Sequence, residues 1–401
     1  MRRALIVIVP VAVLVTLVWW WATRKTVHEF PEHPEPHLKR LWVFDAPTPG
    51  ATVAAPLVTP DAVYFAAVHT RGFKLSGAVY ALDPNTGKRK WTFDRSGDML
   101  PTASSPILSG GRLLLGEGMH ANFVCQFYSL DPATGREQWK YETGDHIEGG
   151  AVAAGGMVYF PAGNDGIVAL HPDGKRAWNY RADFHTDSTP FLAGGRLFFG
   201  TGASRRFKQS YVVCLDARSG EQVWRTPVPL PAWGPPVVAN GKVFVGTGNG
   251  RLHEPAKPPE TPAGAMSCFD ANTGEQLWAF PLTDAVFAQP VIVGERIVFG
   301  CRDGNLYGLS FGGKEVFRVP MGGPVMASAA LAGENVVAAS VPGRVVCVNP
   351  DGAEVWRHEL TTREALVFAP PVVAGRRLFV AAETKAGNLG VVSLSCFEMP
   401  E

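Results

Sequence analysis

A short stretch that ends in an aromatic side chain returns seven times along this 401-residue chain, and it constrains the fold more than any other feature. In its clearest copy, residues 80–87 read Tyr-Ala-Leu-Asp-Pro-Asn-Thr-Gly, and Trp91 follows four residues after the glycine. The aromatic residues of the seven copies are Trp91, Trp139, Trp178, Trp224, Trp278, Phe317 and Trp356, at intervals of 48, 39, 46, 54, 39 and 39 residues. Periods of this length are typical of solenoids and propellers.

Each copy predicts a β-hairpin. An apolar run with β-branched and aromatic residues leads into the turn, and a second strand carries the aromatic away from it. The acidic side chain binds its own backbone two residues on, and the glycine supplies the positive φ that closes the turn. The aromatic is then a large apolar group beside a tight turn, where we expect it to pack against the next unit. Four short strands per unit, without helical periodicity, favour a β-propeller.

The number of blades follows from the strand pairs that precede the hairpins. Eight such pairs are present, one more than the aromatic hairpins, and the last unit stops after a third strand at residues 391–394. Residues 41–44, which include Trp42, form a strand near the start with no partner of its own. Pairing these two strands removes an open sheet edge. The predicted fold is therefore all-β: an eight-bladed β-propeller of four-stranded antiparallel blades, closed by an N-terminal strand and spanning residues 39–401.

The repeated unit resembles that of the pyrroloquinoline-quinone-like (PQQ-like) β-propellers. The resemblance rests on Asp83 to Gly87 followed by Trp91 and on the copies of this text, and it covers roughly residues 39–397. This family includes the quinoprotein alcohol dehydrogenases and the propeller subunit of the outer-membrane β-barrel assembly machinery. The resemblance implies the fold rather than one activity, because such folds host unrelated functions.

A bound quinone is not expected from the sequence. The dehydrogenases of this family hold the quinone between a tryptophan and a disulfide of adjacent cysteines. This chain has no adjacent cysteines and no Cys-x-x-Cys-His motif for a covalent haem. We therefore expect no cofactor, with PQQ as the alternative.

The amino terminus predicts a membrane anchor. Residues 4–22 are apolar apart from Pro10 and Thr16, and nineteen residues suffice to span a bilayer. The stretch ends in Trp19 to Trp21, which is typical of an interfacial aromatic belt rather than of a small-residue cleavage site. We expect a transmembrane signal-anchor at residues 1–25 and a stiff Pro-rich linker at 26–38. A cleaved signal peptide is the alternative, and the resemblance to exported propellers implies a periplasmic or extracellular position for the ring.

Charge and cysteine positions argue against nucleic-acid binding and against disulfide bonds. The chain carries 37 basic and 36 acidic residues, a balance that gives no electrostatic footprint for nucleic acid. Cys214, Cys268 and Cys347 occupy the same slot of their repeats, which other repeats fill with small residues. Equivalent slots in neighbouring blades should lie roughly 10 Å apart, too far for a disulfide. We expect free, buried cysteines.

One face of the ring is predicted to carry the function. The links between blades and the turns between second and third strands share this face, and they contain the variable segments of the chain. These segments are residues 67–77, 117–124, 202–210, 251–264 and 383–389. Binding residues concentrate on loops held by a rigid scaffold, so we expect a protein partner or a small polar ligand there.

Two His-x-acid pairs occupy equivalent positions in adjacent inter-blade links, and the next link places an aromatic residue there. The neighbouring turns contribute arginines. The candidate ligand-binding residues are His146, Glu148, His185, Asp187, Trp233, Arg205 and Arg302.

The two pairs admit several interpretations. Imidazole and carboxylate could ligate a divalent metal, or they could act as an acid/base pair. They could also only satisfy backbone donors and each other within the links. We assign no catalytic residue and no metal ligand, and we predict a membrane-anchored extracytoplasmic binding scaffold. The alternative is a quinoprotein-like or metal-dependent enzyme that uses the His/acid cluster at the channel mouth.

Overall fold

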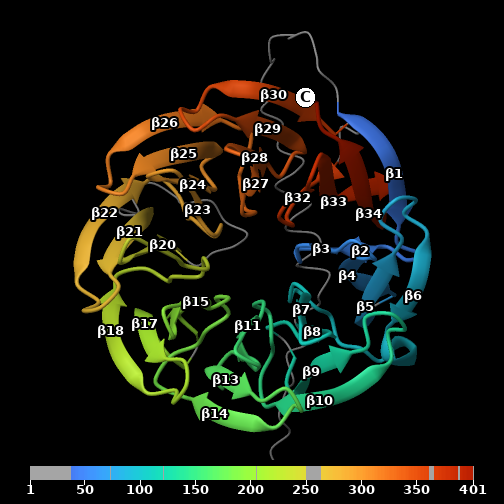
Figure 1. Ribbon diagram of the computed structural model, residues 1–401, viewed down its shortest axis with the longest axis horizontal. Coiled ribbons are helices and arrows are strands. Elements are labelled where there is room, and N and C mark those ends of the chain that lie inside the picture. Colours follow the sequence, from blue (N-terminus) through green and yellow to red (C-terminus); the bar gives the residue numbers. More distant parts are fainter. Residues whose placement is uncertain are drawn as a thin grey trace, which may run out of the picture.

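The computed structural model describes residues 38–400 except 73, 121, 205, 250–262, 361–364 and 387–388. Eight antiparallel sheets surround a central axis (Figure 1), so the predicted eight-bladed all-β propeller is confirmed. In the part of the chain that the structure describes, the helical content is one 3-10 turn, η1 (Arg95–Gly97), and no helix there is long and apolar enough to cross a membrane. The predicted anchor at 1–25 and all of the predicted linker except Leu38 lie outside the described residues.

Six blades take their four strands from consecutive segments, with the first strand nearest the axis and the fourth on the outside (Figure 1). Blade 2 has β7 (Ile107–Ser109), β8 (Arg112–Gly116), β9 (Cys125–Leu130) and β10 (Glu137–Thr143); blade 3 has β11 (Val152–Ala154), β12 (Met157–Pro161), β13 (Ile167–Leu170) and β14 (Arg176–Tyr180); blade 4 has β15 (Phe191–Ala193), β16 (Arg196–Gly200), β17 (Ser210–Asp216) and β18 (Gln222–Val228). Blade 5 has β19 (Val237–Ala239), β20 (Lys242–Gly248), β21 (Gly264–Asp270) and β22 (Gln276–Leu282); blade 6 has β23 (Val291–Val293), β24 (Arg296–Gly300), β25 (Asn305–Ser310) and β26 (Glu315–Pro320); blade 7 has β27 (Ala330–Ala332), β28 (Asn335–Ala339), β29 (Arg344–Val348) and β30 (Glu354–Glu359).

The first and last blades divide their inner strand into two short pieces. In blade 1 both pieces pair with the second strand; its strands are β2 (Gly50–Ala51), β3 (Leu57–Val58), β4 (Val63–Arg71), β5 (Lys74–Leu82) and β6 (Arg89–Phe93). Blade 8 has the same arrangement; its strands are β31 (Ala365–Leu366), β32 (Val372–Ala374), β33 (Arg377–Ala386), β34 (Leu389–Glu398) and β1 (Lys39–Asp45).

The ring closes through β1, as predicted. This strand pairs antiparallel with β34, and Trp42 lies opposite Cys396 in the register. The indole Nε1 of Trp42 donates to the carbonyl oxygen of Pro84 in blade 1 at 3.1 Å. The amino-terminal strand therefore serves as the fourth strand of blade 8 and leaves no open edge between the ends of the chain.

The repeated glycine and aromatic meet at the seams between blades. At Gly135, whose φ is +73°, a Cβ would lie 2.6 Å from Cε3 of Trp91 in the preceding blade. The Nε1 of Trp91 also donates to the carbonyl oxygen of Pro132 at 3.0 Å. The other seams of this kind are Trp42–Gly87, Trp139–Gly174, Trp178–Gly220, Trp224–Gly274, Trp278–Gly313 and Phe317–Gly352. Six of the seven repeat aromatics, and Trp42 with them, pack on the turn of the following unit, which confirms the prediction for these six and explains why the turn ends in glycine. The seventh, Trp356, lies in the core cluster shared by blades 7 and 8.

The core lies between neighbouring blades, where the second and third strands are buried on both faces. Phe127 of β9 and Phe160 of β12 stack with ring centroids 4.1 Å apart, and both are fully buried. Burial of one such side chain contributes roughly 1.5–3 kcal/mol. The six cysteines are buried and free, as expected.

Two segments expected as variable loops are strands instead. Residues 67–77 continue the β4–β5 hairpin as far as the pair Arg71–Lys74. Residues 383–389 likewise continue the β33–β34 hairpin to the pair Ala386–Leu389. Each ladder runs without a register shift as far as its last pair, so the residues up to these pairs belong to the hairpin strands. Most of the segment at 251–264 lies outside the described residues.

Candidate functional site

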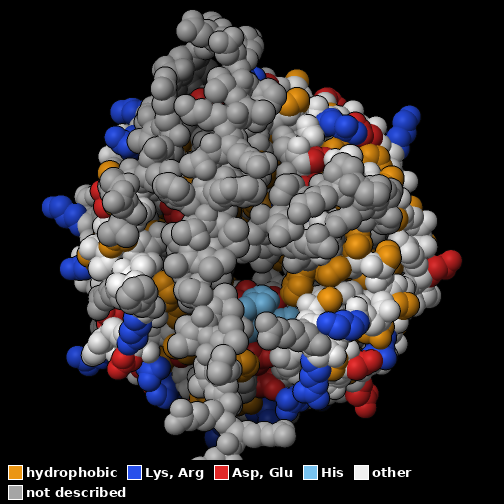
Figure 2. Space-filling model, turned by 180° about the vertical axis from the view of Figure 1, so that it is seen from behind, with side chains coloured by type: hydrophobic (Ala, Val, Ile, Leu, Met, Phe, Trp, Pro, Cys, Tyr) orange, Lys and Arg blue, Asp and Glu red, His pale blue; other side chains and the backbone are white. Residues whose placement is uncertain are grey.

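Three histidines, one from a turn of blade 2 and two from the links that join blades 2, 3 and 4, meet near the axis. Figure 2 shows histidine side chains beside the central opening. His146 belongs to the link between β10 and β11, and His185 to the link between β14 and β15. His120 comes from the turn between β8 and β9. Together with Glu148 and Asp187 we call them the histidine cluster. The expected face therefore brings together both sequence-predicted His-x-acid pairs.

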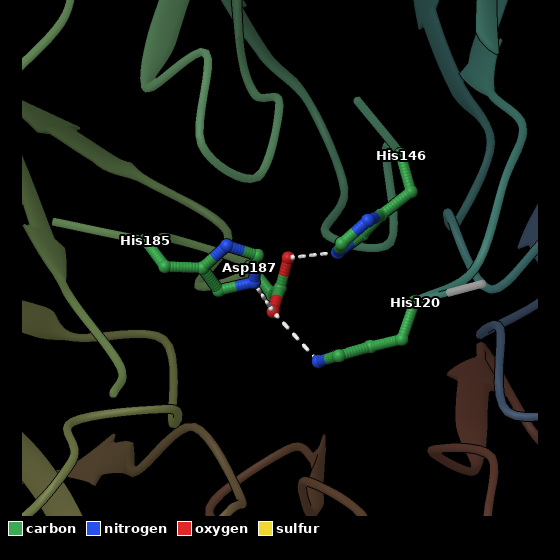
Figure 3. A group of neighbouring side chains, drawn as sticks. All are labelled: His120, His146, His185 and Asp187. Atoms are coloured by element: carbon green, nitrogen blue, oxygen red, sulfur yellow. Dashed lines mark hydrogen bonds and ion pairs between the residues drawn. The ribbon is translucent and has the colours of Figure 1, made fainter. Parts of the chain in front are cut away.

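The carboxylate of Asp187 is the centre of the cluster (Figure 3). Its Oδ1 lies 3.1 Å from Nε2 of His146, and its Oδ2 lies 2.8 Å from Nε2 of His185. Oδ2 is also 3.6 Å from Nε2 of His120. Three imidazoles thus direct the same ring nitrogen at one carboxylate.

The other ring nitrogen of each histidine faces an oxygen of a neighbouring side chain. Nδ1 of His120 lies 2.6 Å from Oε1 of Glu148, which also accepts the backbone N–H of His120. Nδ1 of His185 lies 3.3 Å from Oδ1 of Asn164. Nδ1 of His146 lies 2.7 Å from Oδ1 of Asp145, an ion-pair contact whose angle departs from that of a hydrogen bond.

His120 was not among the residues predicted from the sequence. It lies in the β8–β9 turn, within the variable segment 117–124, and it has no counterpart in the other repeats. Its ring stacks on His146 with centroids 4.7 Å apart. Membership of a variable segment on the binding face was the available signal, and that signal did not distinguish His120 from its neighbours.

The acids and histidines of the cluster shift one another's pKa values. Burial alone would lower the pKa of His146, but contacts with Asp145 and Asp187 outweigh it and raise the pKa to about 10. Burial would raise the pKa of Asp187, yet His146 and His185 hold it well below the usual range. Burial also opposes ionisation of Asp145, whose pKa His146 and Asn164 nevertheless lower. The pKa of His120 is raised because Glu148 and Asp187 outweigh its burial. With no other cation present, the cluster therefore holds protonated His146 between two carboxylates at neutral pH.

Trp233 forms one wall of the cluster. Its ring centroid lies 6.0 Å from that of His185 and 6.3 Å from that of His120. A Cβ on Gly202 would lie 2.1 Å from Cη2 of Trp233, so this glycine allows the indole to approach the backbone. The indole Nε1 is buried and has no hydrogen-bond acceptor among the described residues. It therefore offers an unused donor to a bound group.

Arg302, one of the two predicted arginines, is not brought to the cluster. Arg302 is buried, and its Nε donates to Oδ1 of Asp284 at 2.7 Å. Its Nη2 donates to Asn249 at 2.9 Å, and its guanidinium lies 5.5 Å from the ring centroid of Phe287. Arg302 thus braces the link between β22 and β23 in an ion pair. Arg205 lies outside the described residues.

The Arg302 brace has an equivalent beside the histidine cluster. Asp284 accepts the backbone N–H of Ala285 and pairs with Arg302 from the β24–β25 turn. Asp145 likewise accepts the backbone N–H of His146 and binds Asn164 from the β12–β13 turn, with Oδ2 2.5 Å from Nδ2. The two links therefore share the same aspartate brace, but the residue after the aspartate is Ala285 in one link and His146 in the other.

Comparisons with known proteins give the family and the fold. A family model described as outer membrane protein assembly factor BamB matches residues 39–126, 124–207 and 208–395. No curated protein matches the chain. Among solved structures, BamB from Moraxella catarrhalis is 15% identical, with 90% of this chain and 98% of that chain covered and a TM-score of 0.65.

Two further structures show the same fold in other settings. The computationally designed Ika8 protein is 13% identical over 90% of this chain and 100% of its own, with a TM-score of 0.66. A europium-containing methanol dehydrogenase is 13% identical over 90% of this chain and 93% of its own, with a TM-score of 0.64. Identities this low establish the shared fold, and the family match over most of the ring goes further: this chain belongs to the PQQ-like repeat family of the outer membrane protein assembly factor BamB.

Proposed function

We propose that this chain is a membrane-anchored, extracytoplasmic scaffold that binds a protein partner through the loop-rich face and works without a bound quinone. The observation that carries the proposal is the β8–β9 turn. Phe123 is 68% exposed and Val124 is 57% exposed, the highest values among the large apolar side chains that the structure describes. Aromatic side chains are enriched in protein interfaces, and exposed apolar groups on a rigid frame favour a binding role.

Two further observations support a binding surface. Hydrophobic side chains gather beside the central opening on the face seen in Figure 2. Val124 has a φ of +60°, which is unusual for a β-branched residue and holds the tip of the turn in a specific conformation. Strained residues cluster at ligand clamps and switch regions.

An extracytoplasmic position is supported by the family and by the amino-terminal sequence. The description of the matching family names an outer membrane protein assembly factor. The apolar stretch at residues 4–22 is long enough to anchor the ring to a membrane. A proline-containing linker at 26–38 would hold the propeller away from the bilayer.

The described residues fit a quinone poorly. All six cysteines are buried and free, and no two are adjacent in the sequence, so the disulfide platform of the dehydrogenases has no equivalent here. Trp233 is the aromatic candidate for stacking, but the edge of its indole lies against Gly202. We therefore derive no reaction step through a quinone.

Site-specific cross-linking tests the proposal. A photo-reactive amino acid replaces Phe123 in the full chain, expressed in its native host, and the control position is Val223 on the outer strand β18, which is 41% exposed. We expect one discrete cross-linked adduct from position 123. Co-expression of the unlabelled parent protein should reduce this adduct by competing for the partner. Co-expression of the unlabelled Phe123→Ser variant should leave the adduct unchanged. Equal adducts from both positions, or none from position 123, would contradict the scaffold role.

The anchor is tested separately. Carbonate washing should leave the chain in the membrane pellet, and its mature amino terminus should still carry residues 4–22. A chain cut after Ala22 would be a soluble exported protein instead.

A further inference from the structure

The histidine cluster has the arrangement of a metal site. His120, His146, His185 and Asp187 each offer one ligand atom, and these atoms all lie within 4.8 Å of one another. Nε2 of the three histidines faces the same carboxylate at 2.8–3.6 Å. Four groups from three separate loops thus converge on one small volume beside the axis (Figure 3).

The contacts behind the histidines are those of metal ligands. A ligating histidine usually donates its other ring N–H to a carboxylate or carbonyl oxygen, which fixes the orientation of the ring. Here the three Nδ1 atoms face Glu148 Oε1 at 2.6 Å, Asp145 Oδ1 at 2.7 Å and Asn164 Oδ1 at 3.3 Å. Each of the three rings therefore has a side-chain oxygen beside Nδ1 and directs Nε2 toward Asp187.

The charges make a cation the natural occupant. Without a metal ion, protonated Nε2 atoms donate to the carboxylate of Asp187, as the 3.1 Å contact of His146 and the 2.8 Å contact of His185 indicate. If all three rings did so while each Nδ1–H pointed outward, three imidazolium rings would lie with centroids only 4.7–5.6 Å apart. A single divalent ion between the rings and Asp187 would replace these protons, bind the three Nε2 lone pairs and neutralise the carboxylate.

We propose that His120, His146, His185 and Asp187 bind one divalent first-row transition ion of the zinc class. Three imidazoles and one carboxylate suit zinc and its neighbours rather than calcium or magnesium, which prefer oxygen ligands. Tetrahedral bonds of about 2.1 Å separate ligand atoms by about 3.4 Å. The widest separations, which reach up to 4.8 Å, would therefore shorten, whereas the 2.8 Å and 3.1 Å contacts of Asp187 would lengthen slightly. His120 can supply this movement because it is exposed, whereas His146 and His185 are buried.

The ion would join blades 2, 3 and 4 at the mouth of the ring. Its ligands come from the β8–β9 turn, the β10–β11 link and the β14–β15 link. Asp145, Glu148 and Asn164 would act as positioning residues that orient the ligands. This inference does not depend on the proposed partner binding.

Metal titration of the full chain tests the proposal. The protein is prepared without a polyhistidine tag, stripped with a chelator, and titrated with Zn²⁺ and Co²⁺ by calorimetry and visible absorption. We expect one ion per chain, tighter binding of Zn²⁺, and intense visible absorption from Co²⁺ in a near-tetrahedral site. His185→Ala should weaken Zn²⁺ binding at least 100-fold. The matched control is His171→Ala, which removes an exposed imidazole from the β13–β14 turn.

Two further variants keep the test decisive if His185→Ala does not fold. His120→Ala changes an exposed side chain and should weaken Zn²⁺ binding at least 10-fold. Asp145→Asn should weaken it about 10–100-fold, as expected for the partner of a metal-bound histidine, while Asp284→Asn in the equivalent link should leave it unchanged. No stoichiometric binding by the parent chain, or full affinity in His120→Ala, would overturn the proposal and leave a protonated His/Asp cluster.

Discussion

The seams near the outside of the ring and the links at its mouth differ in how much they change from blade to blade. At the seams, the aromatic of one blade covers the glycine of the next at contact distances that recur around the ring, such as 2.6 Å at Gly87 and 2.7 Å at Gly174 from a Cβ placed on the glycine. At the mouth, equivalent links present His146 in one place and Ala285 in another, although Asp145 and Asp284 brace both in the same way. The repeated contacts close the ring, and the varied positions distinguish this propeller from others.

The largest effect is expected at the seam that closes the ring. Deleting residues 39–45 removes β1 and should abolish cooperative unfolding or cause aggregation, because the edge of β34 becomes exposed. Trp42→Ala alone should lower the free energy of unfolding by about 3–5 kcal/mol. Val43→Ala in the same strand is the control, since Val43 is 43% exposed. Denaturant unfolding measures all three, and a deletion that melts like the parent would refute closure through β1.

The next largest effect is expected at the Arg302 brace. Arg302→Met removes the guanidinium that pairs with buried Asp284 and should cost about 3–5 kcal/mol of unfolding free energy. Asn164→Leu in the equivalent brace removes a neutral partner of Asp145 and should cost about 1–3 kcal/mol. Chemical denaturation measures both losses of unfolding free energy. Equal losses in the two variants would contradict the expectation that leaving the buried charge of Asp284 unpaired costs more than removing the neutral partner of Asp145.

The histidine cluster separates stability from binding. In metal-free protein, His146→Ala with His185→Ala deprives Asp187 of two partners and should lower the unfolding free energy by roughly 1–3 kcal/mol per lost bond. Zn²⁺ at 100 times its dissociation constant should stabilise the parent by about 2.7 kcal/mol. It should leave the double variant unchanged. Thermal melts with and without Zn²⁺ provide the measurement, and equal stabilisation of both proteins would place the metal elsewhere.

The smallest effect is expected at Glu383, a carboxylate without the histidines that surround Asp187. Its Oε1 accepts the backbone N–H of Thr52 at 3.3 Å, and burial raises its pKa to about 7. Between pH 4.5 and 7 the folded chain keeps a proton that the unfolded chain has lost, so stability should fall as the pH rises through this window. Glu383→Gln should abolish this decline, which amounts to about 1.4 kcal/mol per unit of pKa difference. The measurement is the unfolding midpoint of parent and variant across this pH range. The same pH dependence in both proteins would refute the raised pKa of Glu383.

The repeating architecture of this protein could be predicted from its amino-acid sequence alone. The fixed spacing from Gly87 to Trp91 and in its copies predicted the hairpins, the blade count and the seams, because each of these follows from the regular recurrence of one short motif along the chain. The unpaired strand at Trp42 predicted closure for the same reason, since a missing partner is visible in a repeat. The alignment of repeats also placed His146 and His185 in equivalent links, and hence side by side around the axis.

The side chains that complete the site could not be predicted in this way, because they meet through contacts between different loops. His120 has no counterpart in other repeats, so no alignment could place its ring on His146. Arg302 shared the predicted face, yet its pairing with Asp284 depends on contacts between two loops of neighbouring blades. Repeats constrain what is periodic along the chain, whereas the path of an individual turn depends on packing against residues far away in the sequence. The seams could therefore be predicted from the sequence, and the full set of side chains at the mouth could not.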